Sequence, residues 1–230
     1  MITLRDVSME NGEFHLDSVS LEVADGEIYF LLNRLGQGSD FLFRVLGGFQ
    51  PLSAGECLFD GCRQGNGNCV SPPALIDRIG DAADFETEAR VADWIDFLCS
   101  GCDLDRESLF RTLMVCNFHE RHLKKRIREL SPELFQQVYL AASLAPGRRN
   151  IVINDFIRGA EKGFELKFNK LLLQQKGEGR AILCLGGDIF YASEIADRVG
   201  FIKNGRLLFE ADAAELKEMD IKGLYLKFLN

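Results

Sequence analysis

The first thirty residues alternate between apolar and polar positions in short runs separated by turn residues. The stretch from Val19 to Gly26 shows this alternation clearly, and it extends over residues 2–32. When apolar residues recur at every second position, one face of a strand packs on the core and the other faces water. We therefore predict an antiparallel β region at the start of the chain. A further short strand, ended by a turn, is predicted over Gly55–Gly61.

An apolar run, a glycine-containing turn and a helical pattern follow one another around residue 36. The run ends at Leu32, the turn spans Asn33–Asp40 with Gly36 and Gly38, and Phe41–Gly48 has apolar residues at helical spacing closed by glycine. A strand, a glycine loop and a helix in this order are typical of a loop that holds phosphate with its backbone amides. The lysine that such a loop normally carries is missing.

The middle of the chain changes to a helical pattern. From about Ala89 to Arg128, apolar residues recur at the spacing of a helix face, and we expect a helical subdomain there. The residues predicted to face its core are Val91, Trp94, Ile95, Leu98, Leu109, Leu113 and Cys116.

The final third alternates helices with buried strands. Ser131 is placed to cap a helix that continues to Leu144. Residues 150–155 and 181–185 are continuous apolar runs, as expected of strands covered on both faces of a parallel sheet. A helix is predicted between them, near residues 161–175. Strand, helix and strand in this order predict an α/β fold.

The composition narrows the class of protein. The chain has 230 residues, of which 47% are apolar and 27% charged, so we expect a folded protein rather than a disordered one. The formal net charge of -8 argues against non-specific binding to nucleic acid or to an anionic membrane surface, although it leaves a local basic patch open. The apolar runs fall short of the ~20 residues that cross a bilayer, so any membrane role requires a partner.

Cysteine and histidine complete no obvious metal or redox motif. Seven cysteines are scattered through apolar segments, which is typical of thiols in a reducing cytosol. Cys99 and Cys102 have the spacing of half a zinc site or of a redox pair, and buried thiols are favoured because no second pair accompanies them. His119 and His122 are three residues apart, and we interpret them as part of a solvated basic helix end rather than as metal ligands.

Short framework motifs follow one another in a fixed order along the chain. They are Val19–Val23 with Gly26–Ile28, Gly47-Gly48 with Gly55-Glu56 and Asp60-Gly61, Ile79-Gly80, Leu130-Ser131, Leu144–Gly147, and Ala196–Val199 with Ile202–Arg206. Their order and spacing resemble an ATP-binding cassette, the nucleotide-binding domain of ABC transporters, over nearly the whole chain. The resemblance implies an α/β, P-loop NTPase-like ABC ATPase core with an antiparallel β subdomain and a helical subdomain. Residues 1–230 would form a single cassette, with the helical subdomain at about 85–145.

The phosphate loop departs from the pattern of that family. Cassettes use G-x-x-x-x-G-K-[ST], in which the lysine binds phosphate and the hydroxyl binds magnesium. Here Gly36 and Gly38 keep a loop of backbone amides, whereas Ser39 replaces the lysine and Asp40 the hydroxyl residue. A carboxylate about 4 Å from a phosphate oxygen costs on the order of 4 kcal/mol at an effective dielectric of 20, roughly a thousandfold in affinity. Asp40 is also a favourable anion in the first turn of a helix, and we expect both effects.

The catalytic and signature positions also differ from the motifs of that family. By resemblance, Asn154 replaces the magnesium-binding aspartate, Asp155 the glutamate that activates water, and Gly187 the switch histidine. The glutamine-loop position falls on Asp84. The signature motif reads Ser131-Pro132-Glu133, in which proline removes an amide donor and glutamate adds a charge. As plain structure, these three residues are well suited to start a helix.

Loss of all these motifs from an otherwise matching framework predicts a pseudo-ATPase. We expect a degenerate, non-hydrolysing cassette subunit of an ABC transporter that acts as a scaffold or regulator, with no cofactor required and at most weak binding of ATP and magnesium. The resemblance implies two kinds of partner, namely membrane-spanning transporter subunits and another cassette in a hetero- or homodimer. It also implies a cytoplasmic position at the inner face of the cell membrane. Nucleic acid is not an expected partner.

Two alternatives stay open. The first is a divergent but active ATPase in which Asp40, Asn154 and Asp155 form an unusual magnesium site. The second is an interaction protein that uses the cassette surface without any transporter. Turnover by the isolated chain would favour the active enzyme, and co-purification with an integral membrane protein would count against the interaction protein.

Overall fold

The computed structural model describes residues 1–12, 14–33, 38–63, 76–79, 88–101, 106–115, 118–144, 147–155, 162–224 and 226–227. The chain divides into two compact units, each assembled from separate stretches of sequence. The first, here called the sheet unit, comprises Met1–Arg78, Arg148–Phe156 and Gln174–Asn230. The second, the helical unit, comprises Ile79–Gly147 and Ile157–Leu173. No helix among the described residues is long and apolar enough to cross a lipid bilayer.

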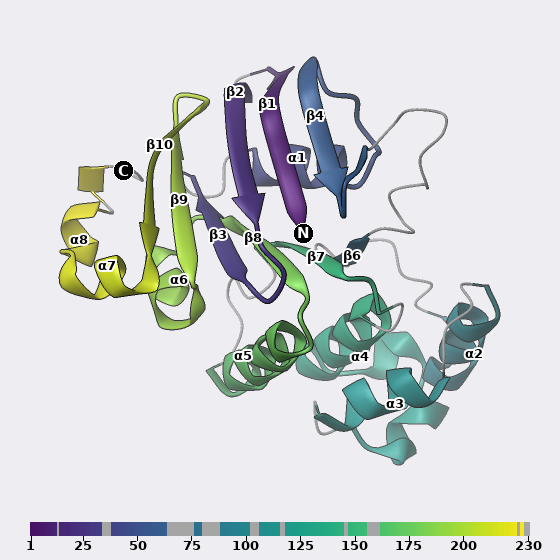
Figure 1. The fold of residues 1–230 in the computed structure, drawn as a ribbon. Coiled ribbons are helices and arrows are strands. Elements are labelled where there is room, and N and C mark those ends of the chain that lie inside the picture. The colour runs from purple at the N-terminus through teal and green to yellow at the C-terminus, as the bar shows by residue number, and fades with distance from the viewer. Residues whose placement is uncertain are drawn as a thin grey trace. The chain divides into compact units, whose positions relative to one another are not determined.

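The sheet unit starts with a four-stranded antiparallel sheet (Figure 1). Its strands lie in the order β2 (Phe14–Val23), β1 (Ile2–Asn11), β4 (Ala54–Phe59) and β5 (Cys62–Arg63). A register shift between Leu4 and Val7 lets both of these β1 side chains reach the core. The antiparallel start predicted from the alternating pattern is confirmed for β1 and β2, and so is the short strand β4.

A six-stranded sheet forms the rest of this unit. Its order is β10 (Arg206–Asp212), β9 (Arg198–Lys203), β3 (Ile28–Leu32), β8 (Ala181–Gly186), β7 (Asn150–Asn154) and β6 (Ile76–Ile79). Strands β9, β3, β8 and β7 run parallel, and every residue of β3, β7 and β8 is buried. The predicted α/β fold is therefore confirmed. Strand β3 is parallel rather than part of the antiparallel start, because its continuous apolar run requires two covered faces.

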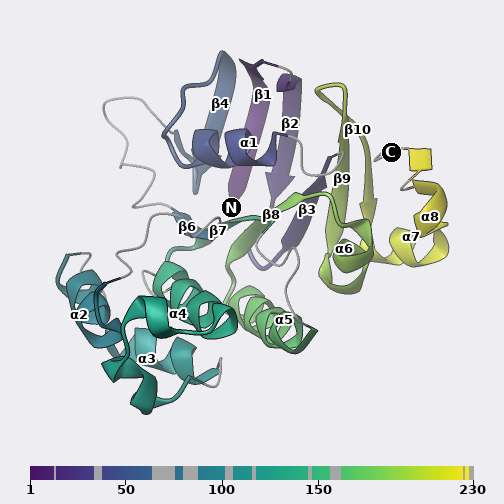
Figure 2. The same cartoon turned by 180° about the vertical axis from the view of Figure 1, so that it is seen from behind.

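Helix α1 (Ser39–Leu46) packs against both sheets. Leu42, Val45 and Leu46 belong to one buried cluster that includes residues of β1, β2, β3, β4, β7 and β8. Figure 2 shows α1 lying across the four-stranded sheet. The helix predicted after the glycine turn is thus confirmed. The other helices described in this unit are α6 (Ile189–Ile195), α7 (Ala213–Glu218) and α8 (Ile221–Leu224).

The helical unit is built from α2 (Val91–Gly101), α3 (Arg106–Val115), α4 (Pro132–Leu144) and the first part of α5 (Lys162–Gly177). Of the predicted core residues, Val91, Ile95, Leu109 and Leu113 are buried, and Trp94 packs half-buried against them. The side chains of Leu98 and Cys99, together with Cys102 and Cys116, lie outside what the structure describes.

The segment between α3 and α4 differs from the helix that its sequence pattern predicts up to Arg128. It forms two short 3₁₀ turns, η3 (Glu120–Lys124) and η4 (Ile127–Glu129). The N–H of Val91 donates to the carbonyl of Lys125 at 3.0 Å, and the N–H of Ile127 donates to the carbonyl of Ala89 at 2.9 Å. Because the backbone here bonds to the start of α2, it cannot form a continuous ladder of i to i−4 hydrogen bonds.

His122 is buried, which corrects its interpretation as part of a solvated helix end. The residue is 7% exposed, and its ring packs edge-on against Phe118 with the centroids 5.3 Å apart. Arg121 Nε donates to His122 Nε2 at 3.2 Å, and Nδ1 has no partner among the described residues. Burial lowers the pKa of His122, and the positive charges of Arg121 and Lys125 together with His119 lower it further.

The free energy of unfolding is therefore expected to fall once the pH drops below about 6.5, the ordinary pKa of histidine. The folded pKa lies below that value, so the unfolded state binds the proton first and acid favours unfolding. Urea unfolding between roughly pH 8 and 5 measures this slope for the wild type and for His122→Gln, which should lose stability less steeply. Equal slopes for the wild type and His122→Gln would contradict the assignment.

Candidate functional site

The expected phosphate loop lies at the carboxyl end of β3, where α1 begins. In open α/β sheets, ligands bind outside the carboxyl ends of the strands. Gly38 has a positive φ of 75° and immediately precedes Ser39, the first residue of α1. Gly36 lies outside the described residues, so the loop is described at its two ends, Asn33 and Gly38.

Ser39, at the lysine position, points into the protein. It is 4% exposed, and its Oγ donates to Oδ1 of Asn33 at 3.3 Å. The N–H of Asn33 donates in turn to the carbonyl of Gly186 at 3.0 Å, which ties the end of β3 to the end of β8. The position that would hold a phosphate-binding cation therefore holds a neutral hydroxyl engaged within the protein.

Asp40 and Asn154 contact each other across the site. Nδ2 of Asn154 donates to Oδ1 of Asp40, which joins the first turn of α1 to the end of β7. Asn154 is 6% exposed, and its Oδ1 has no hydrogen-bond partner among the described residues. Asp40 is exposed, and its negative charge is favoured by the N-terminal dipole of α1. The two residues at the expected magnesium positions are thus bonded to each other.

Asp155 follows β7 in an uncommon backbone conformation. Its φ is 44°, in the left-handed region that residues with side chains rarely adopt. A Cβ built on Gly186 would lie 3.2 Å from Oδ1 of Asp155, so the carboxylate lies close over this glycine. Asn154 and Asp155 thus lie at the carboxyl end of β7, and Asp40 on α1 is joined to them by its hydrogen bond with Asn154.

Gly187 is half-buried at the end of β8 and contributes no side chain to the site. The next residue, Asp188, caps α6, and its Oδ1 accepts hydrogen bonds from the N–H groups of Phe190 and Tyr191 at 3.0 Å each. This cap was missed in the sequence, although an aspartate just before an apolar helical run is its usual signal. The turn after β8 is thus arranged to start a helix.

The signature positions belong to the helical unit and start α4, as predicted. Oγ of Ser131 accepts a hydrogen bond from the N–H of Leu134 at 3.3 Å, and Pro132 is the first helical residue. Glu133 accepts hydrogen bonds from Gln137 Nε2 at 3.2 Å and from Lys167 Nζ at 2.7 Å. The charge of Glu133 is therefore engaged by a cation on α5.

The described part of this site carries Ser39 and Asn154 at the positions where the motifs of that family have a lysine and a magnesium-binding aspartate. Asp40 puts a negative charge at the start of α1, where phosphate would bind, and position 39 offers no cation. Among the described residues, no three histidine, cysteine, aspartate or glutamate side chains lie close enough to hold a metal ion. Asp84, at the predicted glutamine-loop position, lies outside these residues.

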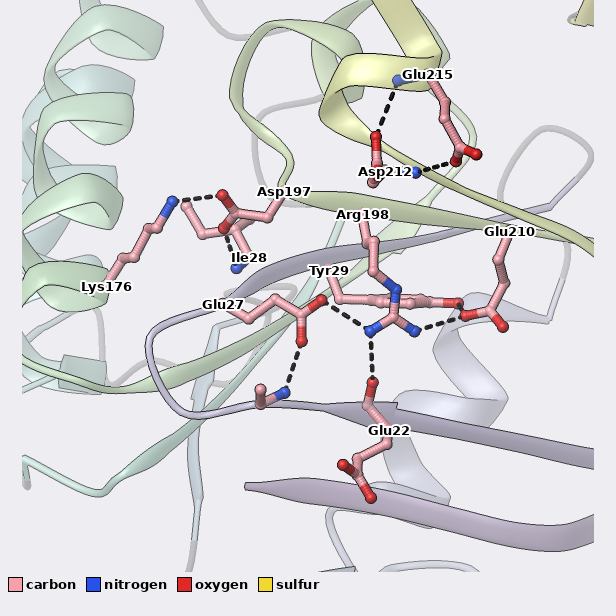
Figure 3. A network of polar contacts seen from close by, with 11 residues as sticks. Glu22, Glu27, Ile28, Tyr29, Lys176, Asp197, Arg198, Glu210, Asp212 and Glu215 are labelled. Carbon is pink, nitrogen blue, oxygen red and sulfur yellow. Dashed lines mark hydrogen bonds and ion pairs between the residues drawn. The ribbon is translucent and has the colours of Figure 1, made fainter.

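A network of charged side chains fixes the opposite end of β3 (Figure 3). Oδ2 of Asp197 accepts from the N–H of Ile28 at 2.8 Å, and its Oδ1 accepts from Lys176 Nζ. One carboxylate thus ties the start of β3 to the end of α5 and to the residue before β9.

Arg198 lies at the centre of this network and packs on Tyr29. Its guanidinium donates to Glu27 at 3.0 Å and to Glu210 at 2.8 Å, and lies 4.9 Å from the centre of the Tyr29 ring. Tyr29 is fully buried, and its hydroxyl donates to Glu210 at 2.7 Å. Burial and this carboxylate raise the pKa of Tyr29, so the hydroxyl stays protonated. A Cβ on Gly200 would lie 2.1 Å from the Tyr29 hydroxyl oxygen, so only glycine leaves room there.

Comparison with known proteins is consistent with this fold. No family model matches the chain. Over 228 residues it is 22% identical to the phosphonates import ATP-binding protein PhnC of Hydrogenovibrio crunogenus, covering 94% of this chain and 84% of that protein. It is 24% identical over 250 residues to a putative ABC transporter ATP-binding protein of Treponema denticola, covering 98% of this chain. The chain spans only 50% of the length of that second relative.

Solved structures with the same fold include two ATP-binding cassettes of ABC transporters. The ADP conformation of MJ1267 superposes with a TM-score of 0.81 at 19% sequence identity, covering 98% of each chain. The dimeric cassette MJ0796 superposes with a TM-score of 0.76 at 18% identity, covering 93% of this chain and 99% of the other. The sequence relatives and the solved structures agree, and the chain has the fold of the ATP-binding cassettes of ABC transporters.

Proposed function

We propose that this chain is a cassette subunit of an ABC transporter that does not hydrolyse ATP at its own phosphate loop. The observation that carries the proposal is the hydrogen bond between Asp40 and Asn154. It joins the two residues at the expected magnesium positions, and of these two only Asp40 carries a carboxylate. The inward Ser39 supplies no compensating cation.

The relatives support a role beside a transporter. The phosphonate relative is by its name an import ATP-binding protein, and MJ0796 is a dimeric cassette. We therefore propose membrane-spanning subunits as partners, with a second cassette paired to this one, at the inner face of the cell membrane. In a pair with a complete cassette, this chain would provide one failed phosphate loop and the altered signature Ser131-Pro132-Glu133. Its contribution would then be that of a scaffold or regulator.

One observation favours a second candidate, a divergent but active ATPase. Oδ1 of Asn154 is buried and has no hydrogen-bond partner in the part of the chain that the structure describes, and Asp40 and Asp155 lie beside Asn154. A cation bound to these oxygens would satisfy the unpaired atom and reverse the repulsion toward phosphate.

Hydrolysis measured on the isolated chain separates the two candidates. We expect no magnesium-dependent release of phosphate from ATP above the rate without protein, and no change of that rate in Asp155→Asn. Turnover by the wild type that Asp155→Asn abolishes would overturn the proposal and establish the second candidate.

Native purification tests the transporter assignment independently. Isolation of the chain from its own cells under mild detergent, followed by identification of the bound chains, should yield an integral membrane protein and a cassette with an intact phosphate-loop lysine. Recovery of soluble partners alone would instead support an interaction protein that uses the cassette surface outside any transporter.

A further inference from the structure

An exposed group of cations lies on the helical unit, on the segment between α3 and α4 and on the residue before α2. We call it the basic patch and define it as Arg90, Arg121, Lys124 and Lys125, all of which are exposed. Among the residues that the structure describes, none of the four has a carboxylate within ion-pair distance. The neighbouring Arg126 and Arg128 differ, because both are paired with Glu88.

Backbone contacts hold the basic patch together. Arg90 lies beside the end of η3, because it forms a β-bridge with Arg126 and because the N–H of Val91 donates to the carbonyl of Lys125. At the end of η3, the N–H of Lys125 donates to the carbonyl of His122 at 3.1 Å. The buried side chains of Phe118 and Ile127 anchor the segment at both ends. The cations therefore project from an ordered turn rather than from a free tail.

Positive charges outnumber negative ones in this segment, because residues 119–129 contain five lysine or arginine residues and two glutamates. The lowered pKa of His122 reflects this excess, because the charges of Arg121 and Lys125 add to the effect of burial on that ring. Glu120 is the one exposed carboxylate within η3. Charges farther away than about 10 Å are largely screened at moderate ionic strength, so the net charge of -8 does not remove the local attraction for anions.

We propose that the basic patch binds the anionic phospholipid headgroups of a membrane surface. Lysine presents a point charge on a flexible stem, which suits a layer of many phosphates better than one fixed carboxylate partner. Met114 adds an apolar side chain that is 64% exposed, and the hydrogen bond from the Phe118 N–H to the Leu113 carbonyl places it near the start of this segment. The proposal is independent of whether the chain hydrolyses ATP.

Vesicle flotation tests the proposal with the full-length chain. At low ionic strength, the wild type should float with phosphatidylcholine vesicles that contain phosphatidylglycerol, and should stay behind with phosphatidylcholine alone. Each removed lysine should weaken binding about fivefold, so Lys124→Gln with Lys125→Gln should weaken it about twenty-fivefold. The matched control is Lys217→Gln with Lys222→Gln, which removes two exposed lysines from α7 and α8 and should bind like the wild type.

Several outcomes would overturn the proposal. These are failure of the wild type to float with the anionic vesicles, full retention of binding in Lys124→Gln with Lys125→Gln, and an equal loss in the control pair. Displacement from the vesicles by inorganic phosphate at constant ionic strength would indicate a site for a soluble anion instead. Binding to immobilised polyglutamate without binding to vesicles would indicate an acidic protein partner. Thermal unfolding of each variant verifies that it is folded.

Discussion

The double substitution Ser39→Lys with Asp40→Ser is expected to raise the affinity of the chain for ATP with magnesium by roughly a hundredfold. Removal of the carboxylate relieves a repulsion on the order of 4 kcal/mol at about 4 Å, and the exposure of Asp40 reduces that value by solvent screening. The lysine adds attraction for the phosphates. Isothermal titration with ATP and magnesium measures the difference from the wild type.

Turnover should stay absent in this variant. Asn154 and Gly187 still offer neither a magnesium carboxylate nor a side chain for the terminal phosphate. Ser39→Ala is the matched control, because it removes the inward hydroxyl without adding a cation and should leave the affinity unchanged. An unaltered affinity in the double variant would show that the charges at positions 39 and 40 do not determine whether nucleotide binds.

Gly200→Ala is expected to lower the free energy of unfolding by about 3 kcal/mol or more, the upper range for overpacking in a core. The added methyl group would lie 2.1 Å from the Tyr29 hydroxyl oxygen and 2.9 Å from Leu207 Cδ1, and Tyr29 is fully buried and hydrogen-bonded to Glu210. Urea denaturation followed by circular dichroism measures the loss. Gly177→Ala is the matched control, because a methyl group meets nothing within 4 Å there and should be neutral or stabilising.

A second substitution identifies the cause of that loss. Tyr29→Phe removes the oxygen that the new methyl group would strike, so the double variant with Gly200→Ala should be more stable than the sum of the single effects predicts. Strictly additive effects would show that the destabilisation comes from somewhere other than the contact between residues 29 and 200.

Much of the fold could be predicted from local patterns, because those patterns reflect burial. The continuous apolar runs gave β7 and β8, and the helical spacing after Gly38 gave α1. The segment after Phe118 could not be predicted in this way. Lys125 and Ile127 make backbone hydrogen bonds with residues 89–91, and these bonds prevent the continuous helix that the pattern predicts. They cannot be predicted from the local sequence.

The candidate site shows the same division. The residue types at positions 39, 40, 154 and 155 could be recognised from the order of motifs, and so could the loss of charge complementarity with phosphate. The hydrogen bond between Asp40 and Asn154 joins residues 114 positions apart, and only the folded sheet brings them together. The ion pair between Glu133 and Lys167 could not be predicted from the sequence for the same reason, because it links two helices across 34 residues.

The order of strands has a consequence for folding. Strands β1, β2, β4 and β5 all come from the first 63 residues, so the antiparallel sheet has short-range pairings and is expected to form early. Strand β3 lies between β8 and β9, which begin at Ala181 and Arg198, so its backbone has no strand partner until the chain has been synthesised beyond residue 181. A nascent chain of this topology exposes an unpaired, aggregation-prone strand during most of its synthesis. We therefore expect the yield of folded protein in cells to depend on chaperones.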